Sequence, residues 1–549
     1  MRVWENLEPR EVFRYFEELC AIPHGSGNTA AISAWIAHFA RERNLKYRQE
    51  PCGNVIIWKD ASPGCEEAPV VMLQGHMDMV AVKMAECDLD LRTQGLRPAI
   101  SQDGQWVYAK GTSLGADDGI AVAYALAILA DDTLVHPPLE AVFTVDEEVG
   151  LIGASLLDTS DLRSRFLLNM DSEEDGVFLT SCAGGGTFVC YAPAKREEKT
   201  GILYEWRVQG LLGGHSGSDI DKDRLNANVL FGRFLAQVVR PCGAFVGAFA
   251  GGEKDNAIPN SCRALLLLEP RAPEGGAFET SAVTGAPAPA DWIQEAALSP
   301  AGGEGDATGQ RASGKSVAGR AVPEGVQTRE TEFLCRARAF ADTVCAEYRT
   351  SEPDLCIELV RIGEGTRTVL AKEALSRLSL LLAAFPAGIQ RRMPQLPDMV
   401  QTSLSLGILR WEETEPEIRL VFCLRSSSES EKNWLICRME EIVHGTGCRS
   451  ELSGVYSAWE YRPDSSLRDI MVQAYQEISG ETPLLTGIHA GVECGIFCEK
   501  LPGIDCISYG PEMRDIHTYR ERLQIASVQK TYELTCRVLE KIAYAAINL

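Results

Sequence analysis

The chain has 549 residues, of which 45% are apolar, so it can form two or three globular units that each bury a core, and a small disulfide-stapled scaffold is excluded. Lys and Arg number 53 against 77 Asp and Glu, and the net charge of −24 disfavours nucleic acid and anionic membranes as partners. Most of these carboxylates are expected to be solvated surface groups.

The N-terminal residues 1–20 mix charges every few positions and lack the pattern of a signal peptide, which predicts a cytoplasmic protein. The longest apolar run, residues 120–130, is too short to span a bilayer and predicts a buried helix. The 18 cysteines include no C-x-x-C pair, so we expect reduced, dispersed thiols. A metal site in this chain would therefore need His and carboxylate ligands.

Helices and strands are predicted to alternate in the first third of the chain. Amphipathic helices are expected over residues 9–19 and 29–41, and another helix over about 118–130. Short apolar runs that begin at Asn54, Pro69, Glu140 and Arg165 predict strands. This order indicates an α/β fold with a mixed, largely parallel sheet and helices on both faces.

The composition changes between about residues 270 and 331, where Gly, Ala, Pro and Ser dominate. Such a stretch buries too little apolar surface to offset its ordering entropy, so we expect a disordered insertion without a chemical role. Beyond it, the pattern predicts a helix over 331–348, a strand over 418–427 and a last helix over about 526–545.

Three predicted strands run into acidic residues or histidine. The strand from Pro69 leads to His76 and Asp78, the next to Glu147 and Glu148, and the third to Asp171. Ligand crevices of open α/β sheets lie beyond the carboxyl ends of the strands, so these side chains can converge. Any one of them alone would be an ordinary polar loop, but three together favour a site.

The residue types in these clusters suit a metal. Adjacent carboxylates such as Glu147 and Glu148 repel each other unless a cation or proton lies between them. A glycine-rich loop delivers Asp117 and Asp118 to the start of a helix, where an N-cap is the simpler interpretation. Together with His517, the set offers imidazole and carboxylate ligands, which suit zinc, or else manganese or cobalt.

The order of these motifs resembles the M20 family of di-zinc metallopeptidases, and within it the aminoacyl-histidine dipeptidase branch. The resemblance extends from the first hundred residues to near the C-terminus, through GHMDMV, GTSLGADDGI, TVDEEVGLIGA, LLNMDSEE, GLLGGHSG, KDNAIPN, CLRSS, IHAGVECGIF and YGPEMRDIHT. After His517 the chain reads TYRER, where many relatives carry a proline and an acidic residue, so the rim of the site is expected to differ.

The resemblance implies a role for each residue of the predicted centre. One zinc ion would be held by His76 and Asp171, the other by Glu148 and His517, with Asp117 bridging the two and Asp78 orienting His76. Glu147 would act as general base and acid on a water that bridges the zinc ions. Spacing alone leaves open which of Glu147 and Glu148 is the base.

A second group matches positions that touch substrate in this family. An imidazole or amide at His215 or Asn260 could stabilise an oxyanion, and the Arg425 guanidinium suits a terminal carboxylate. His489 matches a further family segment. The alternatives are a solvent-facing His215 in a tight turn, a surface charge at Arg425 and a structural His489.

The resemblance further implies a catalytic domain built from residues 1–183 and 456–549, with an α+β lid inserted at 184–455. The expected activity is metal-dependent hydrolysis of small peptides, namely dipeptides with a free amino terminus, in a homodimer formed through the lid. The alternatives are an M20-type aminoacylase that acts on N-acyl amino acids and a non-catalytic binding protein on the same fold.

Overall fold

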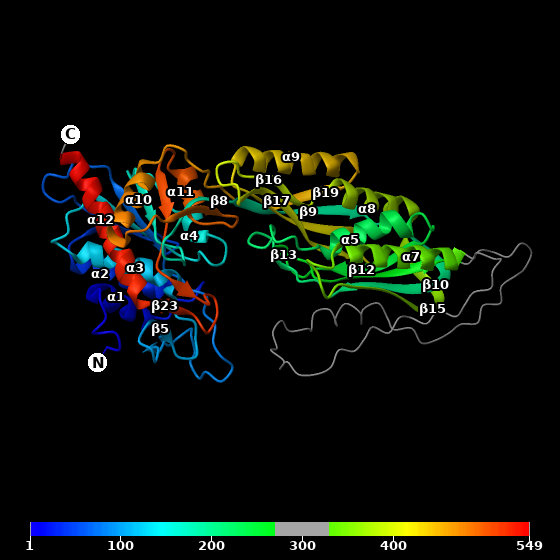
Figure 1. The fold of residues 1–549 in the computed structure, drawn as a ribbon, viewed down its shortest axis with the longest axis horizontal. Coiled ribbons are helices and arrows are strands. Elements are labelled where there is room, and N and C mark those ends of the chain that lie inside the picture. The colour runs from blue at the N-terminus through cyan, green and yellow to red at the C-terminus, as the bar shows by residue number, and fades with distance from the viewer. Residues whose placement is uncertain (1, 270–328, 548–549) are drawn as a thin grey trace, which may run out of the picture.

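The structure is a computed structural model that describes residues 2–269 and 329–547, and it consists of two lobes along one long axis (Figure 1). Most of the predicted insertion, residues 270–328, lies outside the described residues. The chain resumes with helix α7 (Arg329–Glu347), so residues 329–331, which were expected to close the insertion, are helical instead. No helix within the described ranges is long and apolar enough to cross a membrane.

The first lobe is built on an eight-stranded mixed sheet. In sheet order the strands are β1 (Lys46–Gln49), β2 (Val55–Lys59), β6 (Leu139–Thr144), β3 (Val71–His76), β7 (Phe166–Asn169), β21 (Asp505–Ser508), β8 (Val177–Cys182) and β20 (Leu484–Ile488). The neighbours β6, β3, β7 and β21 pair in parallel, as do β8 and β20. The pairs β1–β2, β2–β6 and β21–β8 are antiparallel.

Both faces of this sheet are covered, because alternate residues of a strand point to opposite sides. Val55 and Ile57 of β2 pack into a large core, whereas Ile56 between them joins a smaller core on the other face. The large core includes α1 (Arg10–Cys20), α2 (Ala30–Glu42), α3 (Ala116–Ala130), α10 (Ser466–Ser479) and α12 (Ile525–Ile547). The smaller one includes α4 (Ile152–Leu156) and α11 (Cys494–Lys500).

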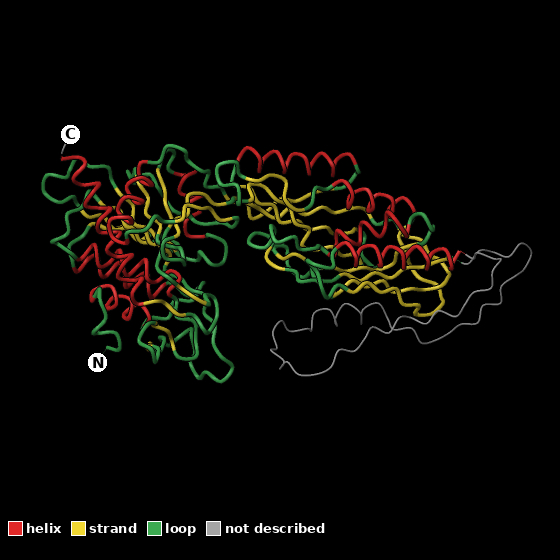
Figure 2. Tube along the Cα trace, in the orientation of Figure 1, coloured by secondary structure: helices red, strands yellow, loops and turns green. Residues whose placement is uncertain are grey.

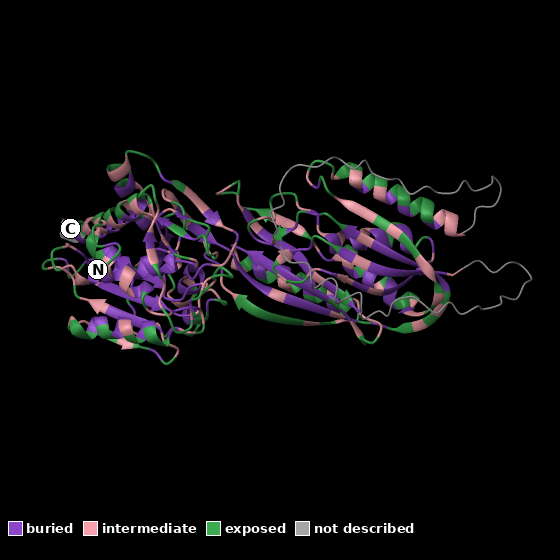
Figure 3. Cartoon of the chain, turned by 90° about the horizontal axis from the view of Figure 1, so that it is seen from below, coloured by how far each residue is buried: buried purple, intermediate pink, exposed green. Residues whose placement is uncertain are grey.

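The second lobe holds a nine-stranded antiparallel sheet and its own buried core, separate from those of the first lobe (Figures 2 and 3). The core is closed by helices α5 (Ala227–Phe234), η1 (Leu235–Val239), α7, α8 (Lys372–Ala384) and α9 (Glu429–Gly445). Its strands are β15 (Cys356–Leu370), β10 (Arg196–Gln209), β14 (Cys262–Leu268), β12 (Phe245–Gly251), β17 (Val400–Trp411), β18 (Glu417–Ser426), β9 (Gly184–Pro193) and β19 (Arg449–Tyr456), with β16 (Gly388–Arg392) beside β17.

This sheet contains the same arrangement twice. The elements β10, α5, β12, β14, α7 and β15 form one half, and β9, α8, β17, β18, α9 and β19 form the other. In each half the strands lie in the order last, first, third, second, and the two second strands, β12 and β17, pair edge to edge. The edges of β12 and β17, which would be open if each half stood alone, are thereby paired with each other within one chain.

Two adjacent segments connect the lobes. Cys182, at the end of β8, and Trp459, after β19, exchange backbone hydrogen bonds of 3.0 and 3.1 Å. Beside them Gly184 has no room for a side chain, because a Cβ atom there would lie 2.5 Å from the Ala458 nitrogen. The second lobe is thus inserted between residues that are neighbours in the first.

A small sheet brings the C-terminal region to the glycine-rich loop. It contains β22 (Met513–Arg514), β23 (Arg522–Gln524), β5 (Trp106–Ala109) and β4 (Pro98–Ile100). Strand β23 pairs with β5, which precedes the loop that enters α3. This pairing carries residues 515–521 to the carboxyl end of the large sheet.

Candidate metal centre

The three motifs that follow strands lie together, because β6, β3 and β7 are adjacent and parallel. His76 is the last residue of β3, Glu147 and Glu148 follow β6, and Asp171 follows β7. The Nε2 atom of His76 lies 3.7 Å from Oδ1 of Asp171. The sequence motifs therefore meet at one edge of the sheet.

Asp117 lies between the two histidines. Its Oδ1 is 3.1 Å from Nε2 of His76, and its Oδ2 is 3.1 Å from Nε2 of His517. His517 also approaches Oε1 of Glu148 at 2.9 Å. One carboxylate thus faces both imidazoles, although 400 residues separate Asp117 from His517 along the chain.

Potential ligand atoms form overlapping groups within 4.8 Å of one another. One group is His76, Asp117 and Asp171, and a second is Asp117, Glu148 and His517. A third combines His76 with Glu147 and Glu148. The first two groups share only Asp117, which is the arrangement that two cations with one bridging carboxylate require.

The electrostatics of the cluster favour added positive charge. Burial raises the pKa of Asp171 to about 6, and burial with the nearby carboxylates Asp171 and Glu493 raises the pKa of Glu147. Contacts with Asp117 and Glu148 raise the pKa of His517 to about 11. The cluster holds more negative charge than its histidines neutralise, and divalent cations would supply the balance. The donor set therefore fits metal ions.

Asp78 lies beside His76, the residue that it is predicted to orient. The Nδ1 atom of His76 lies 3.0 Å from the backbone oxygen of Asp78 and 3.5 Å from its carboxylate. The carboxylate accepts hydrogen bonds from the Glu147 backbone N–H (3.0 Å) and the Ser26 hydroxyl (2.8 Å). Asp78 thus links the imidazole to the backbone of Glu147, which places both residues.

The simpler interpretation of the two adjacent aspartates as helix caps does not hold. The residue before α3 is Gly115, and no side chain caps the helix. Asp117 faces the histidines, whereas Asp118 is fully buried and its Oδ2 accepts the His76 backbone N–H at 3.2 Å. The pair therefore serves the cluster.

Three of the four predicted substrate contacts lie together near the joint of the lobes. The Arg425 guanidinium approaches Nε2 of His215 at 3.2 Å and donates to the Tyr456 hydroxyl at 3.0 Å. His489 lies close by, since a Cβ atom on Gly217 would meet its backbone oxygen, the His215 ring and the Arg425 guanidinium. The cluster is positively charged, so it suits an anionic group.

His489 and Asn260 have distinct surroundings. His489 is buried, and its Nε2 lies 2.7 Å from the Ser403 hydroxyl of β17, so it links the two lobes. Burial, with Arg425 nearby, lowers its pKa to about 3. Asn260 is exposed, two residues beyond the short strand β13 (Ala257–Ile258) that pairs with β11 (Gly214–His215). It is near His215 but forms no part of the charged group.

Sequence reasoning missed the role of two buried glutamates. Glu493 is fully buried, and its carboxylate accepts hydrogen bonds from Gln74 of β3 and from the Thr144 hydroxyl (2.7 Å) of β6. The carboxylate of Glu521 accepts backbone N–H groups of the loop that carries Asp117. Their partners are hundreds of residues away, so no local pattern identifies them.

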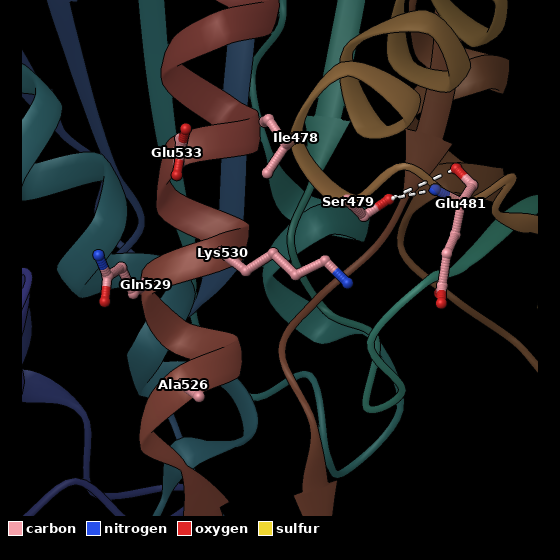
Figure 4. A pocket seen from close by; sticks show the side chains of 7 residues that line it. All are labelled: Ile478, Ser479, Glu481, Ala526, Gln529, Lys530 and Glu533. Carbon is pink, nitrogen blue, oxygen red and sulfur yellow. Dashed lines mark hydrogen bonds between the residues drawn. The ribbon is translucent and has the colours of Figure 1, made fainter.

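Another cleft contains none of these residues (Figure 4). It has a volume of about 360 Å³ between α10 and α12. Its Lys530 is bound to Asp175 (3.0 Å) and to the Tyr475 hydroxyl (2.6 Å), so its one lysine is already paired.

All 18 cysteines are free thiols, as predicted.

Comparison with known proteins assigns the family. A family model described as Peptidase family M20/M25/M40 matches residues 72–541. The chain belongs to this family of metal-dependent peptidases, which confirms the resemblance seen in the motifs.

Two relatives extend over almost the whole chain. The cytosol non-specific dipeptidase of Escherichia coli (strain K12) is 30% identical over 539 residues, which is 98% of both chains. The crystal structure of aminoacylhistidine dipeptidase from Vibrio alginolyticus is also 30% identical, with a TM-score of 0.80, and the match covers 98% of this chain and 97% of that one. Aminopeptidase PepT from Bacillus cereus, at 14% identity, 98% and 99% coverage and a TM-score of 0.50, shares the fold.

Proposed function

We propose that the protein hydrolyses dipeptides with a free amino terminus, with broad specificity that includes Xaa-His and β-alanyl-histidine. The observation that carries this proposal is the pair of donor groups that share Asp117, with Glu147 beside them. The names of the two full-length relatives, a non-specific dipeptidase and an aminoacylhistidine dipeptidase, support the substrate class. The E. coli relative also supports a cytoplasmic location.

The proposed cofactor is a pair of zinc ions, which manganese or cobalt could replace. His76 and Asp171 would hold one ion, Glu148 and His517 the other, and Asp117 both. When bound, two such ions polarise the peptide carbonyl and lower the pKa of water.

Glu147 is the proposed general base. Its backbone N–H is fixed by Asp78 at 3.0 Å, while its carboxylate lies in the group with His76 and Glu148. Burial raises its pKa, so the carboxylate binds a proton more readily, as a group that takes a proton from water and returns it to the leaving amine must do.

The second lobe is proposed to act as a lid. Residues 1–183 and 456–549 would form the catalytic domain and 184–455 the lid. Arg425 would bind the substrate carboxylate, and His215 would stabilise the oxyanion. Asn260, close to His215, and His489, close to Arg425, are proposed as further substrate contacts. Closure of the lid would exclude water from the peptide bond.

We also propose a homodimer through the lid, which light scattering in solution tests.

The experiment for the proposed activity compares blocked and free substrates. The zinc-loaded protein is assayed with Ala-His, with N-acetyl-Ala-His and with β-alanyl-histidine. We expect turnover of both free dipeptides and little turnover of the acetylated one. A strong preference for the acetylated substrate would instead identify an aminoacylase, and no turnover with zinc, manganese or cobalt would identify a binding protein.

A further inference from the structure

We propose that Glu521 is a positioning residue that sets the bridging carboxylate of Asp117 for two metal ions. This inference rests on the proposed function, since it assumes that Asp117 bridges metals. Glu521 lies between His517 and strand β23 and is 3% exposed. It touches no predicted ligand atom, so it would act through the backbone of the loop.

The carboxylate of Glu521 spans four consecutive backbone amides. Its Oε2 accepts the N–H groups of Leu114 (2.8 Å) and Gly115 (3.0 Å). Its Oε1 accepts those of Ala116 (2.7 Å) and Asp117 (3.4 Å). Both oxygens are used, so one side chain holds four consecutive amides of the loop.

The loop needs such a clamp because its backbone is irregular. Gly115 has a left-handed conformation, with φ of 68°, and Asp117 is not helical although it lies in the first turn of α3. Regular helical hydrogen bonds therefore do not fix the position of Asp117. A carboxylate is the side chain that accepts several N–H donors at once.

The segment from His517 to Glu521 contacts Asp117 at two points. His517 approaches the side chain, and Glu521, four residues later, binds the backbone. Since both oxygens of Asp117 lie 3.1 Å from an imidazole, a shift of the loop would disturb both donor groups together. Loss of Glu521 should thus weaken metal binding more than it weakens the fold.

The test measures zinc affinity by chelator competition and, separately, thermal unfolding of the metal-free protein. In Glu521→Gln the amide NH₂ would face two N–H donors without an acceptor. We expect the zinc Kd to rise by about tenfold or more, as for other residues that orient metal ligands. The unfolding temperature of the metal-free variant should fall, because buried N–H donors lose an acceptor, but no further than that of the control variant with the same kind of loss.

Glu140→Gln is the matched control. Glu140 is buried in the same lobe, and its carboxylate accepts the backbone N–H groups of Arg163 (2.9 Å) and Ser164 (3.1 Å), away from the metal cluster. Its loss should leave zinc affinity unchanged. If Glu521→Gln does not fold, Glu521→Asp keeps the charge on a shorter side chain and should show the same weakened binding.

The outcomes separate this inference from the proposed function. Wild-type protein that binds none of zinc, manganese and cobalt would refute the proposed function itself. Wild-type protein that binds two ions, with either folded Glu521 variant binding them equally well, would overturn only the inference. If both variants fail to fold even with excess zinc, the carboxylate serves the fold, and the inference is likewise overturned.

Discussion

His517 and His489 belong to two clusters that shift the pKa of an imidazole in opposite directions. Beside Asp117 and Glu148, the pKa of His517 rises to about 11, whereas burial near Arg425 lowers the pKa of His489 to about 3. The first cluster attracts cations, and the second attracts anions. A dipeptide needs both, since metal ions act on its peptide bond and an arginine can hold its carboxylate.

Glu147→Gln should produce the largest effect, because it removes the proposed base and keeps the shape of the side chain. We expect kcat to fall by about 10²- to 10⁴-fold, the usual contribution of general acid–base catalysis. Steady-state kinetics and elemental analysis on the same sample check this. Zinc content should be unchanged, and near-normal turnover would assign the proton transfer to another group.

His517→Ala tests the metal cluster itself. It removes the imidazole that lies 2.9 Å from Glu148 and 3.1 Å from Asp117. Zinc content should drop from two ions per chain toward one. We also expect kcat/KM to fall by about 100-fold or more, because loss of a metal ligand should cost at least as much activity as loss of a residue that only orients a ligand. His38→Ala, on an exposed helical face, is the control. Two tightly bound ions in His517→Ala would contradict its role as a ligand.

Arg425→Ala tests the cationic cluster. A hydrogen bond to a charged group contributes about 1.5–3 kcal/mol, so KM for free dipeptides should rise by about 10- to 150-fold. Dipeptide amides, which lack the carboxylate, should show little change. An equal rise for both substrates would mean that Arg425 only supports His215 and Tyr456.

His489→Gln should have the smallest effect on turnover, and it should change how stability depends on pH. Because the folded pKa of about 3 lies below the usual value near 6.5, the unfolded state binds the extra proton, and stability is lost as pH falls from 6.5 toward 3. The loss is about 1.4 kcal/mol per pH unit in that window. Urea unfolding of metal-free protein should show a shallower pH dependence in the variant. Equal slopes would place a charged His489 in the folded protein, despite Arg425 and His215 nearby.

The metal cluster is the more predictable of the two regions. Parallel strands place their carboxyl ends together, so the motifs after β3, β6 and β7 could be joined from the sequence alone. The bounds of α1, α2 and α12 also agree with the predicted ranges within about two residues, because their apolar spacing is regular.

The rest depends on contacts that sequence patterns do not record. The amides that Glu521 binds lie 404 to 407 residues before it. The duplicated strand order of the second lobe is likewise hidden, since one half interrupts the other between β9 and α8. Even Asp78, found from its spacing, meets His76 mainly through its backbone oxygen.

The most direct test of the central claim is hydrolysis of a small dipeptide panel while zinc is titrated into metal-free protein. If the cluster around Asp117 holds two catalytic ions, activity should be absent without metal and reach its maximum at two ions per chain. Dipeptide hydrolysis by metal-free protein, or two bound ions without hydrolysis, would contradict the account.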